Sequence, residues 1–159
     1  MERTNTLRIR APRQRILRLA AEVERWPDLL PHYRWVCVRG QLADGRRIVE
    51  MAANRDGIPV RWVAIQGVRA GEGIITFKHI GGPTLGMDVA WVLRDGGDGT
   101  VETRIEHQFA PAWPPLVGPW IARHVVGEFF IANVADKTLA RIKEIAEAPV
   151  DPKGRPWAD

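Results

Sequence analysis

The sequence predicts an α+β fold in which a seven-stranded antiparallel curved sheet wraps around a long C-terminal helix, with two short helices after the first strand. Two observations carry this prediction. Six strand-like segments follow one another from Tyr33 to Phe109, separated by short stretches rich in turn residues. Helical patterns precede and follow them, at about residues 12–25 and 115–148. The long C-terminal helix is the only predicted element large enough to cover one face of such a sheet.

The N-terminal region predicts one strand and two helices. The segment NTLRIRA, at about residues 5–11, alternates apolar and polar residues and is expected to form the first strand. Pro12 suits the first position of a helix, and apolar residues then recur at helical spacing through about Arg25. Pro27 is expected to end this helix, because proline removes a backbone donor and clashes with the preceding turn. The stretch PDLLP then leaves room for one short second helix.

The six central segments are expected to form an antiparallel meander. Their connections, ADGR, DGIP, RAGEG, GGPTLG and DGGDGT, contain the Gly and Asp residues that tight turns favour. Parallel neighbours would need longer crossovers, so each strand is expected to pair with the next. A curved sheet that grips one helix leaves a space beside that helix. The aromatic stretch VERWPDLLPHYRWV, residues 23–36, is expected to form the rim or lid of this space.

Length and composition indicate one domain. The chain has 159 residues, of which 45% are hydrophobic. We expect a single ligand-binding domain over residues 1–148 and a mobile tail over 149–159, which contains three prolines and little to bury. No apolar run approaches the roughly 18 residues of a membrane span, and the N-terminus lacks the apolar core of a signal peptide. With Cys37 as the single cysteine, a cytoplasmic location is expected.

The charge pattern does not indicate a nucleic-acid partner. The formal net charge is +4, but the basic residues are mostly arginines spread along the chain. The densest pair is Arg46 and Arg47, and no run of five to eight basic residues occurs. We therefore interpret the excess of positive charge as part of an ordinary solvated surface, and we expect no nucleic-acid binding.

Strand alternation predicts which side chains face the interior. In TVETRIEHQF, Thr103 and His107 share a face with apolar residues, and in GIITFKHI an outward Lys78 turns Phe77 and His79 inward. If Met51 faces inward, Arg55 joins it near the rim. The full set of predicted ligand-binding residues, including those of the long helix, is Trp35, Met51, Arg55, Trp62, Phe77, Met87, Val89, Trp91, Trp120, Gly127, Glu128 and Ile131.

The long helix carries a further group of polar candidates. Placed at 100° per residue, one arc of this helix contains Trp120, Ile131, Ala135, Thr138 and Ile142. His124 falls in the middle of this arc and Glu128 near its edge, at the i,i+4 spacing that allows them to pair. Gly127 leaves a gap beside them where a ligand could approach the backbone.

Histidine is the commonest general acid or base near neutral pH, so His79, His107 and His124 are the candidate catalytic residues. The alternative is that each is only hydrogen-bonded within the core. No HxxxH or HxH spacing occurs, so a metal site is not expected. No cofactor is expected either, because GGPTLG lies between two strands without a following helix and is interpreted as a hairpin loop.

Four apolar residues of the long helix, Val125, Val126, Phe129 and Phe130, fall on its expected outer side. Contiguous exposed apolar surface often marks a contact site. These residues predict a homodimer interface or a peripheral membrane contact near the cavity mouth. The rival interpretation is that the proline-rich loop 110–119 folds back over them.

Three stretches resemble the START-like helix-grip superfamily (SRPBCC), in its polyketide cyclase/dehydrase and coenzyme Q-binding branch. They are AAEVERWPDLLPHYRWVCV at 20–38, GGPTLGMDVAWVL at 81–93 and DGTVETRIEHQF at 98–109. The resemblance implies a hydrophobic cavity between sheet and helix that holds a small polyketide, quinone or isoprenoid-type molecule. Two functions stay open. One is a cofactor-independent cyclase or dehydratase in which a histidine moves a proton, and the other is a non-catalytic lipid or quinone carrier.

Overall fold

The computed structural model describes residues 2–55, 57–110 and 132–149. In chain order its elements are β1 (Glu2–Ile9), α1 (Arg13–Ala21), the 3₁₀ turn η1 (Val23–Arg25), α2 (Trp26–Leu29), β2 (Tyr33–Gln41), β3 (Arg47–Arg55), β4 (Ile58–Arg69), the 3₁₀ turn η2 (Ala70–Glu72), β5 (Ile74–Gly81), β6 (Met87–Asp95), β7 (Val101–Phe109) and α4 (Ala132–Glu147). The predicted fold class is confirmed.

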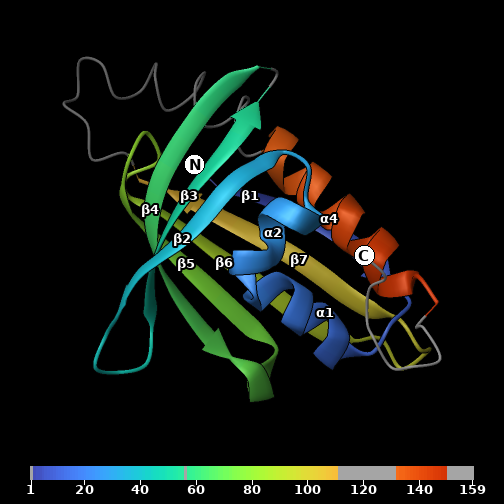
Figure 1. Cartoon of the computed structure of the whole chain (residues 1–159). Coiled ribbons are helices and arrows are strands. Elements are labelled where there is room, and N and C mark those ends of the chain that lie inside the picture. The colour runs from blue at the N-terminus through green and yellow to red at the C-terminus, as the bar shows by residue number, and fades with distance from the viewer. Residues whose placement is uncertain (1, 56, 111–131, 150–159) are drawn as a thin grey trace.

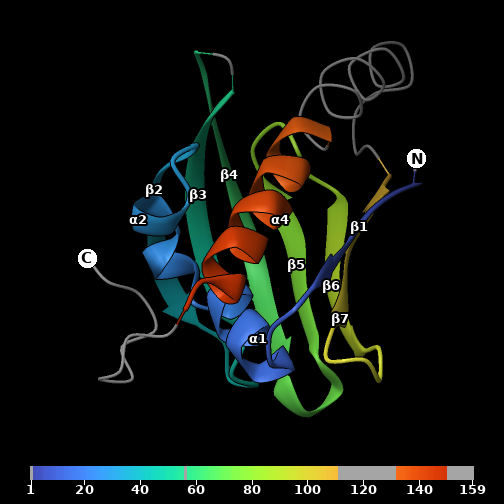
Figure 2. The ribbon, with the colours of Figure 1, turned by 90° about the vertical axis from the view of Figure 1, so that its right-hand side faces the viewer.

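The strands form one seven-stranded sheet in the order β1-β7-β6-β5-β4-β3-β2, and every neighbouring pair is antiparallel. Strands β2 to β7 make the predicted meander, and β1 joins its far edge beside β7. Figures 1 and 2 show the sheet curving around α4, which lies across its concave face, with α1 near the C-terminal end of α4. Arg15 of α1 donates to the carbonyl oxygens of Ile145 and Ala148, which ties these two helices together.

The core lies between the concave face and the helices, as the alternation of the strands predicts. In β6 the buried residues are Met87, Val89, Trp91 and Leu93, and in β7 they are Val101, Thr103, Ile105, His107 and Phe109. From the other side α4 contributes Val134, Ala135, Thr138, Leu139 and Ile142. Buried side chains that recur at every second position of the strands therefore pack against buried side chains that recur every three to four positions along the helix.

The end of the first helix differs from the prediction. Helix α1 ends at Ala21, where the N–H of Glu22 bonds to the carbonyl of Arg18, and the chain then makes a 3₁₀ turn. Pro27 does not end this helix but lies in the first turn of α2. The reason is that the first turn of a helix needs no donor from its backbone nitrogens, so proline is well tolerated there.

A bulge in β2 overturns the placement of Trp35. Tyr33 pairs with Ala53, but a register shift follows and Trp35 pairs with Ala52 instead of Met51. An extra residue in a strand reverses the side of the sheet on which later side chains lie. Tyr33 is consequently buried in the core, whereas Trp35 is 36% exposed on the opposite face. The prediction that Trp35 lines the interior is therefore wrong.

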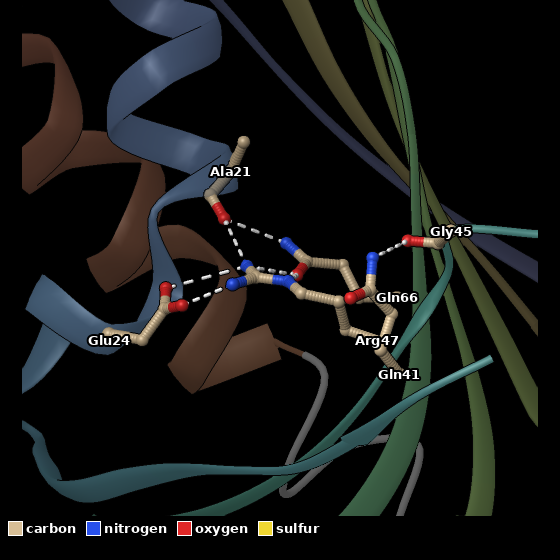
Figure 3. Close-up of polar contacts among 6 residues, drawn as sticks. All are labelled: Ala21, Glu24, Gln41, Gly45, Arg47 and Gln66. Atoms are coloured by element: carbon tan, nitrogen blue, oxygen red, sulfur yellow. Dashed lines mark hydrogen bonds and ion pairs between the residues drawn. The ribbon is translucent and has the colours of Figure 1, made fainter.

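A polar cluster joins the end of α1 to the middle of the sheet (Figure 3). In this Arg47 cluster the side chain of Gln66, which is 1% exposed, donates from Nε2 to the Ala21 carbonyl at 2.8 Å. Its Oε1 accepts from Arg47 Nη2 at 2.7 Å, and Arg47 also pairs with Glu24. The carbonyl at the helix end and the amide of Gln66 are thus both satisfied away from water.

Replacing Gln66 with leucine is expected to lower the free energy of unfolding by about 1–3 kcal/mol, because the Ala21 carbonyl and Arg47 lose a buried partner. Glu24→Gln is the matched control in the same cluster. Its side chain is exposed, so the expected loss is below about 1 kcal/mol. Urea unfolding of the two variants measures both values, and equal losses would contradict the role assigned to Gln66.

Several sequence predictions fall outside the described residues. These are the first part of the long helix, the rival loop 110–119 beyond Ala110, the tail from 150 onward, and all contacts of Val125, Val126, Phe129 and Phe130. Within the described ranges, no helix is both long and apolar enough to cross a membrane.

Candidate functional site

A pocket of about 60 Å³ lies between the concave face of the sheet and α4. Its aromatic lining consists of Trp26, Tyr33, Trp62, Phe77 and Trp91. Aliphatic and thioether side chains add Met51, Met87, Val89, Ile105, Val134 and Ala135. The polar lining residues are His79, His107 and Thr138. Among these described residues none is Asp, Glu, Lys or Arg, so the pocket is apolar with a few neutral polar groups.

The aromatic residues form one connected wall. Trp26 touches Tyr33 edge-on at a centroid distance of 4.9 Å and lies 6.3 Å from Trp91. Its indole N–H donates to the carbonyl of Leu19 at 2.9 Å, which holds the ring in place. Such contacts between rings add specific geometry to the burial of apolar area. The aromatic bend at residues 23–36 therefore contributes a wall of the pocket through Trp26 and Tyr33.

His79 enters the pocket from β5. Its Nδ1 lies 2.6 Å from Thr84 Oγ1 in the β5–β6 loop, and both residues are buried. Its ring is parallel to that of Trp62, with an interplanar angle of 1° and a centroid distance of 6.1 Å. Burial lowers the pKa of His79 to about 3, and the nearby His107 adds to this effect. His79 is consequently a neutral imidazole at physiological pH.

His107 enters from β7, on the same wall. It is 6% exposed, and its Nδ1 is buried without a hydrogen-bond partner among the residues that the structure describes. Burial lowers its pKa to about 4, while a backbone contact with Arg3 and the charge of Asp136 act in the opposite direction. A buried polar atom without a partner is uncommon and often indicates a place for a water molecule or a ligand atom.

A third polar group, which the sequence patterns did not predict, is formed by His32, Tyr33 and Thr138. His32 Nε2 lies 2.9 Å from Thr138 Oγ1, and this hydroxyl donates to the Val134 carbonyl at 2.7 Å. Because the single hydroxyl hydrogen is used, Nε2 of His32 must be the donor. Burial lowers the pKa of His32 to about 4 and raises that of Tyr33, whose hydroxyl also contacts Thr138. Thr138 falls on the predicted inward arc of the helix, and this is the one signal that could have led to the group.

The arrangement can bind and orient an uncharged polar group within an apolar environment. At neutral pH the three histidines are uncharged, because each has a pKa of about 3 or 4. A general acid or base is most effective with a pKa near the working pH. The pocket as it stands therefore favours hydrogen bonding over proton transfer.

The predicted site residues divide into three groups. Those that line the pocket are Met51, Trp62, Phe77, His79, Met87, Val89, Trp91 and His107. Trp35 lies on the other face, and the side chain of Arg55 is outside the described part of the chain. Also outside it are Trp120, His124, Gly127, Glu128 and Ile131.

Metal ligands do not converge anywhere in the described ranges: no group of three or more His, Cys, Asp or Glu side chains there could hold a metal ion.

Comparison with protein families identifies this chain. The family described as "Polyketide cyclase / dehydrase and lipid transport" matches residues 9–140. The chain belongs to this family. The polyketide cyclase/dehydrase match spans α1, the six strands of the meander and about half of α4, and so includes every described residue that lines the pocket. None of the curated proteins compared with the sequence matches it.

Several solved structures share the fold of this polyketide cyclase/dehydrase family member. The Zhui aromatase/cyclase from Streptomyces sp. R1128 has a TM-score of 0.82 at 17% identity, with 98% of each chain covered. A START superfamily protein from Mycobacterium smegmatis has a TM-score of 0.69 at 14% identity, covering 92% of this chain and 97% of that one. The di-domain ARO/CYC BexL from the BE-7585A biosynthetic pathway has a TM-score of 0.68 at 21% identity, covering 91% of this chain and 45% of that one. At these identities the likeness establishes the fold alone.

Proposed function

We propose that this protein binds a small hydrophobic molecule of the polyketide, quinone or isoprenoid type between the sheet and α4. The observation that carries the proposal is the lining of the pocket, where aromatic and methionine side chains surround a few neutral polar groups. Small-molecule sites have this composition, because apolar area supplies affinity and a few polar groups fix orientation. Membership of the polyketide cyclase/dehydrase and lipid transport family supports it. We take residues 1–148 as one START-like ligand-binding domain, located in the cytoplasm.

The volume of the pocket bears on how a ligand enters. Ligand sites usually measure about 300–1,000 Å³, whereas this pocket measures about 60 Å³. A polyketide-sized molecule therefore requires its walls to move. Met51 and Met87 are suited to this, because methionine has three rotatable bonds and repacks easily. Binding is expected to open the pocket by rearranging these side chains without changing the sheet.

A cofactor-independent cyclase or dehydratase is the enzymatic form of this proposal. The observation in its favour is that His79 and His107 face the same pocket from β5 and β7. With pKa values of about 3 and 4 they are poor bases in the empty pocket. As neutral donors they can still stabilise the oxyanion of an enolising carbonyl, an effect that is large where water is excluded. A lipid or quinone carrier needs only the binding step.

Filling the pocket is expected to weaken binding. Ala135 of α4 lines the pocket, and Ala135→Val adds two methyl groups there. Ala140→Val is the matched control on the same helix, because Ala140 is exposed and the cost of a β-branched residue in a helix is the same. Affinity for an extracted ligand, measured through the fluorescence of the pocket tryptophans, should fall roughly 5- to 100-fold in the first variant only. Equal affinity in both variants would place the ligand elsewhere.

The ligand for that measurement comes from native mass spectrometry of the protein purified from its own organism, followed by organic extraction. One apolar molecule, bound stoichiometrically and recovered unchanged, would favour the carrier. A cyclised product together with its linear precursor would favour the enzyme.

A further inference from the structure

Thr84 lies in the β5–β6 loop, and the sequence gives no reason to assign it a role in the pocket. It is 1% exposed, and its hydroxyl approaches His79 Nδ1 at 2.6 Å. Three backbone hydrogen bonds fix the loop around this contact: Gly86 N–H to the His79 carbonyl, Met87 N–H to the Thr84 carbonyl, and Leu85 N–H to the Gly82 carbonyl. Imidazole and hydroxyl therefore belong to one rigid hairpin.

A count of hydrogens gives the direction of this bond. The Thr84 hydroxyl has one hydrogen, and within the described ranges His79 Nδ1 is its only hydrogen-bond partner. If Nδ1 carried the proton, the hydroxyl hydrogen would be buried without an acceptor, which is costly. If the hydroxyl donates, Nδ1 accepts and both atoms of this contact are satisfied. The neutral ring then carries its hydrogen on Nε2.

The other side of the ring is open to the pocket. Nε2 has no hydrogen-bond partner in the described part of the chain. It is not one of the fully buried polar atoms without a partner, so it remains accessible. His79 itself lines the pocket, and the contact of its Nδ1 with Thr84 orients the ring. The Nε2–H group of His79 is therefore available to donate a hydrogen bond to a ligand that enters the pocket.

We propose that Thr84 is a positioning residue that holds His79 as an Nε2–H donor, so that the pocket selects apolar molecules bearing a neutral oxygen acceptor such as a ketone. This inference rests on the proposed function and specifies the ligand class. A ketone oxygen accepts the hydrogen bond from Nε2, whereas a hydrocarbon of the same shape leaves that donor without a partner. A carboxylate is disfavoured, because no described lining residue is positively charged.

The first test needs no ligand. ¹⁵N-labelled imidazole NMR of the full-length protein at pH 7, with His79 assigned through His79→Gln, should show the Nε2–H tautomer. Thr84→Val removes the hydroxyl at nearly constant shape and should give a mixture of tautomers. Thr84→Ser restores the hydroxyl and should restore the single tautomer, which a purely structural role of Thr84 would not require. An Nδ1–H tautomer in the wild type, or no change in Thr84→Val, would overturn the inference.

The second test measures selectivity with 9-fluorenone and fluorene, which share one shape and differ in a ketone oxygen. The wild type and Thr84→Ser should bind fluorenone roughly 3- to 10-fold more tightly, and Thr84→Val should show a smaller preference, because only the molecules with the Nε2–H tautomer offer the donor. Equal affinity of the wild type for both compounds would overturn the selectivity. If neither compound binds while the tautomer is as expected, the proposed function fails and the positioning role of Thr84 stands.

Discussion

Gly82→Ala is expected to destabilise the protein by about 2–5 kcal/mol. Gly82 has a φ of +88°, in the left-handed region that costs other residues about 1–2 kcal/mol. A Cβ atom there would also lie 2.5 Å from the carbonyl oxygen of Arg61 and 2.9 Å from Cα of Trp62. Both are backbone atoms of β4, which cannot turn aside as a side chain can. Overpacking of this kind adds roughly 1–3 kcal/mol.

Gly45 provides the matched control for this prediction. Its φ is +89°, but a Cβ atom there would meet nothing within 4 Å. Gly45→Ala should therefore cost only the conformational part, about 1–2 kcal/mol. Urea unfolding of both variants separates the two contributions, and equal losses would show that the contact with β4 relaxes freely. Because Gly82 begins the loop that carries Thr84, its variant should also disturb the tautomer of His79.

Acidification from pH 6.5 to pH 5 is expected to remove about 3 kcal/mol of stability through His79 and His107 together. Their pKa values are about 3 and 4 in the folded protein and 6.5 in the unfolded chain. Between these values the unfolded chain binds more protons, so stability rises with pH and is lost as pH falls below 6.5. The slope that each histidine contributes rises from about 0.7 kcal/mol per pH unit at pH 6.5 to nearly 1.4 at pH 5. His32 is only partly buried and acts in the same direction to a smaller extent.

Urea unfolding at half-unit steps between pH 7 and pH 5 tests this dependence. His79→Gln and His107→Gln should each reduce the slope by about one proton, since glutamine does not titrate. The carboxylates whose pKa lies below the usual range, Asp44, Asp98 and Glu147, lose their charge below this window and do not interfere. A flat profile in the wild type would mean that both imidazoles are accessible to protons in the folded state.

Most of the fold follows from local patterns in the sequence. A period of two residues in β5, β6 and β7 correctly placed His79 and His107 on the concave face, because a strand without a bulge has no freedom to rotate its side chains. The same reasoning failed at Trp35. The bulge after Tyr33 is set by pairing with β3, and the local sequence carries no sign of it.

The polar contacts of the site were harder to predict, because they join residues that are distant in sequence or lie in loops. His32 and Thr138 are 106 positions apart, and only the packing of α4 against the connection between α2 and β2 brings them together. Thr84 lies five positions from His79, but GGPTLG was interpreted as a plain hairpin loop. A threonine between glycines is typical of a turn, and its burial depends on how tightly that turn packs on β4.

The pairing of β1 with β7 has a consequence for biosynthesis. Glu2 pairs with Gln108 and Ile9 with Val101, so the first strand has no neighbour until the ribosome has made about one hundred further residues. During this time β1 has no neighbouring strand with which to pair. Long-range pairing of this kind slows folding and lengthens the time for which aggregation-prone apolar surface is exposed. The nascent chain is therefore expected to depend on chaperones until β7 emerges, and the N-terminal segment should be the last part of the sheet to dock.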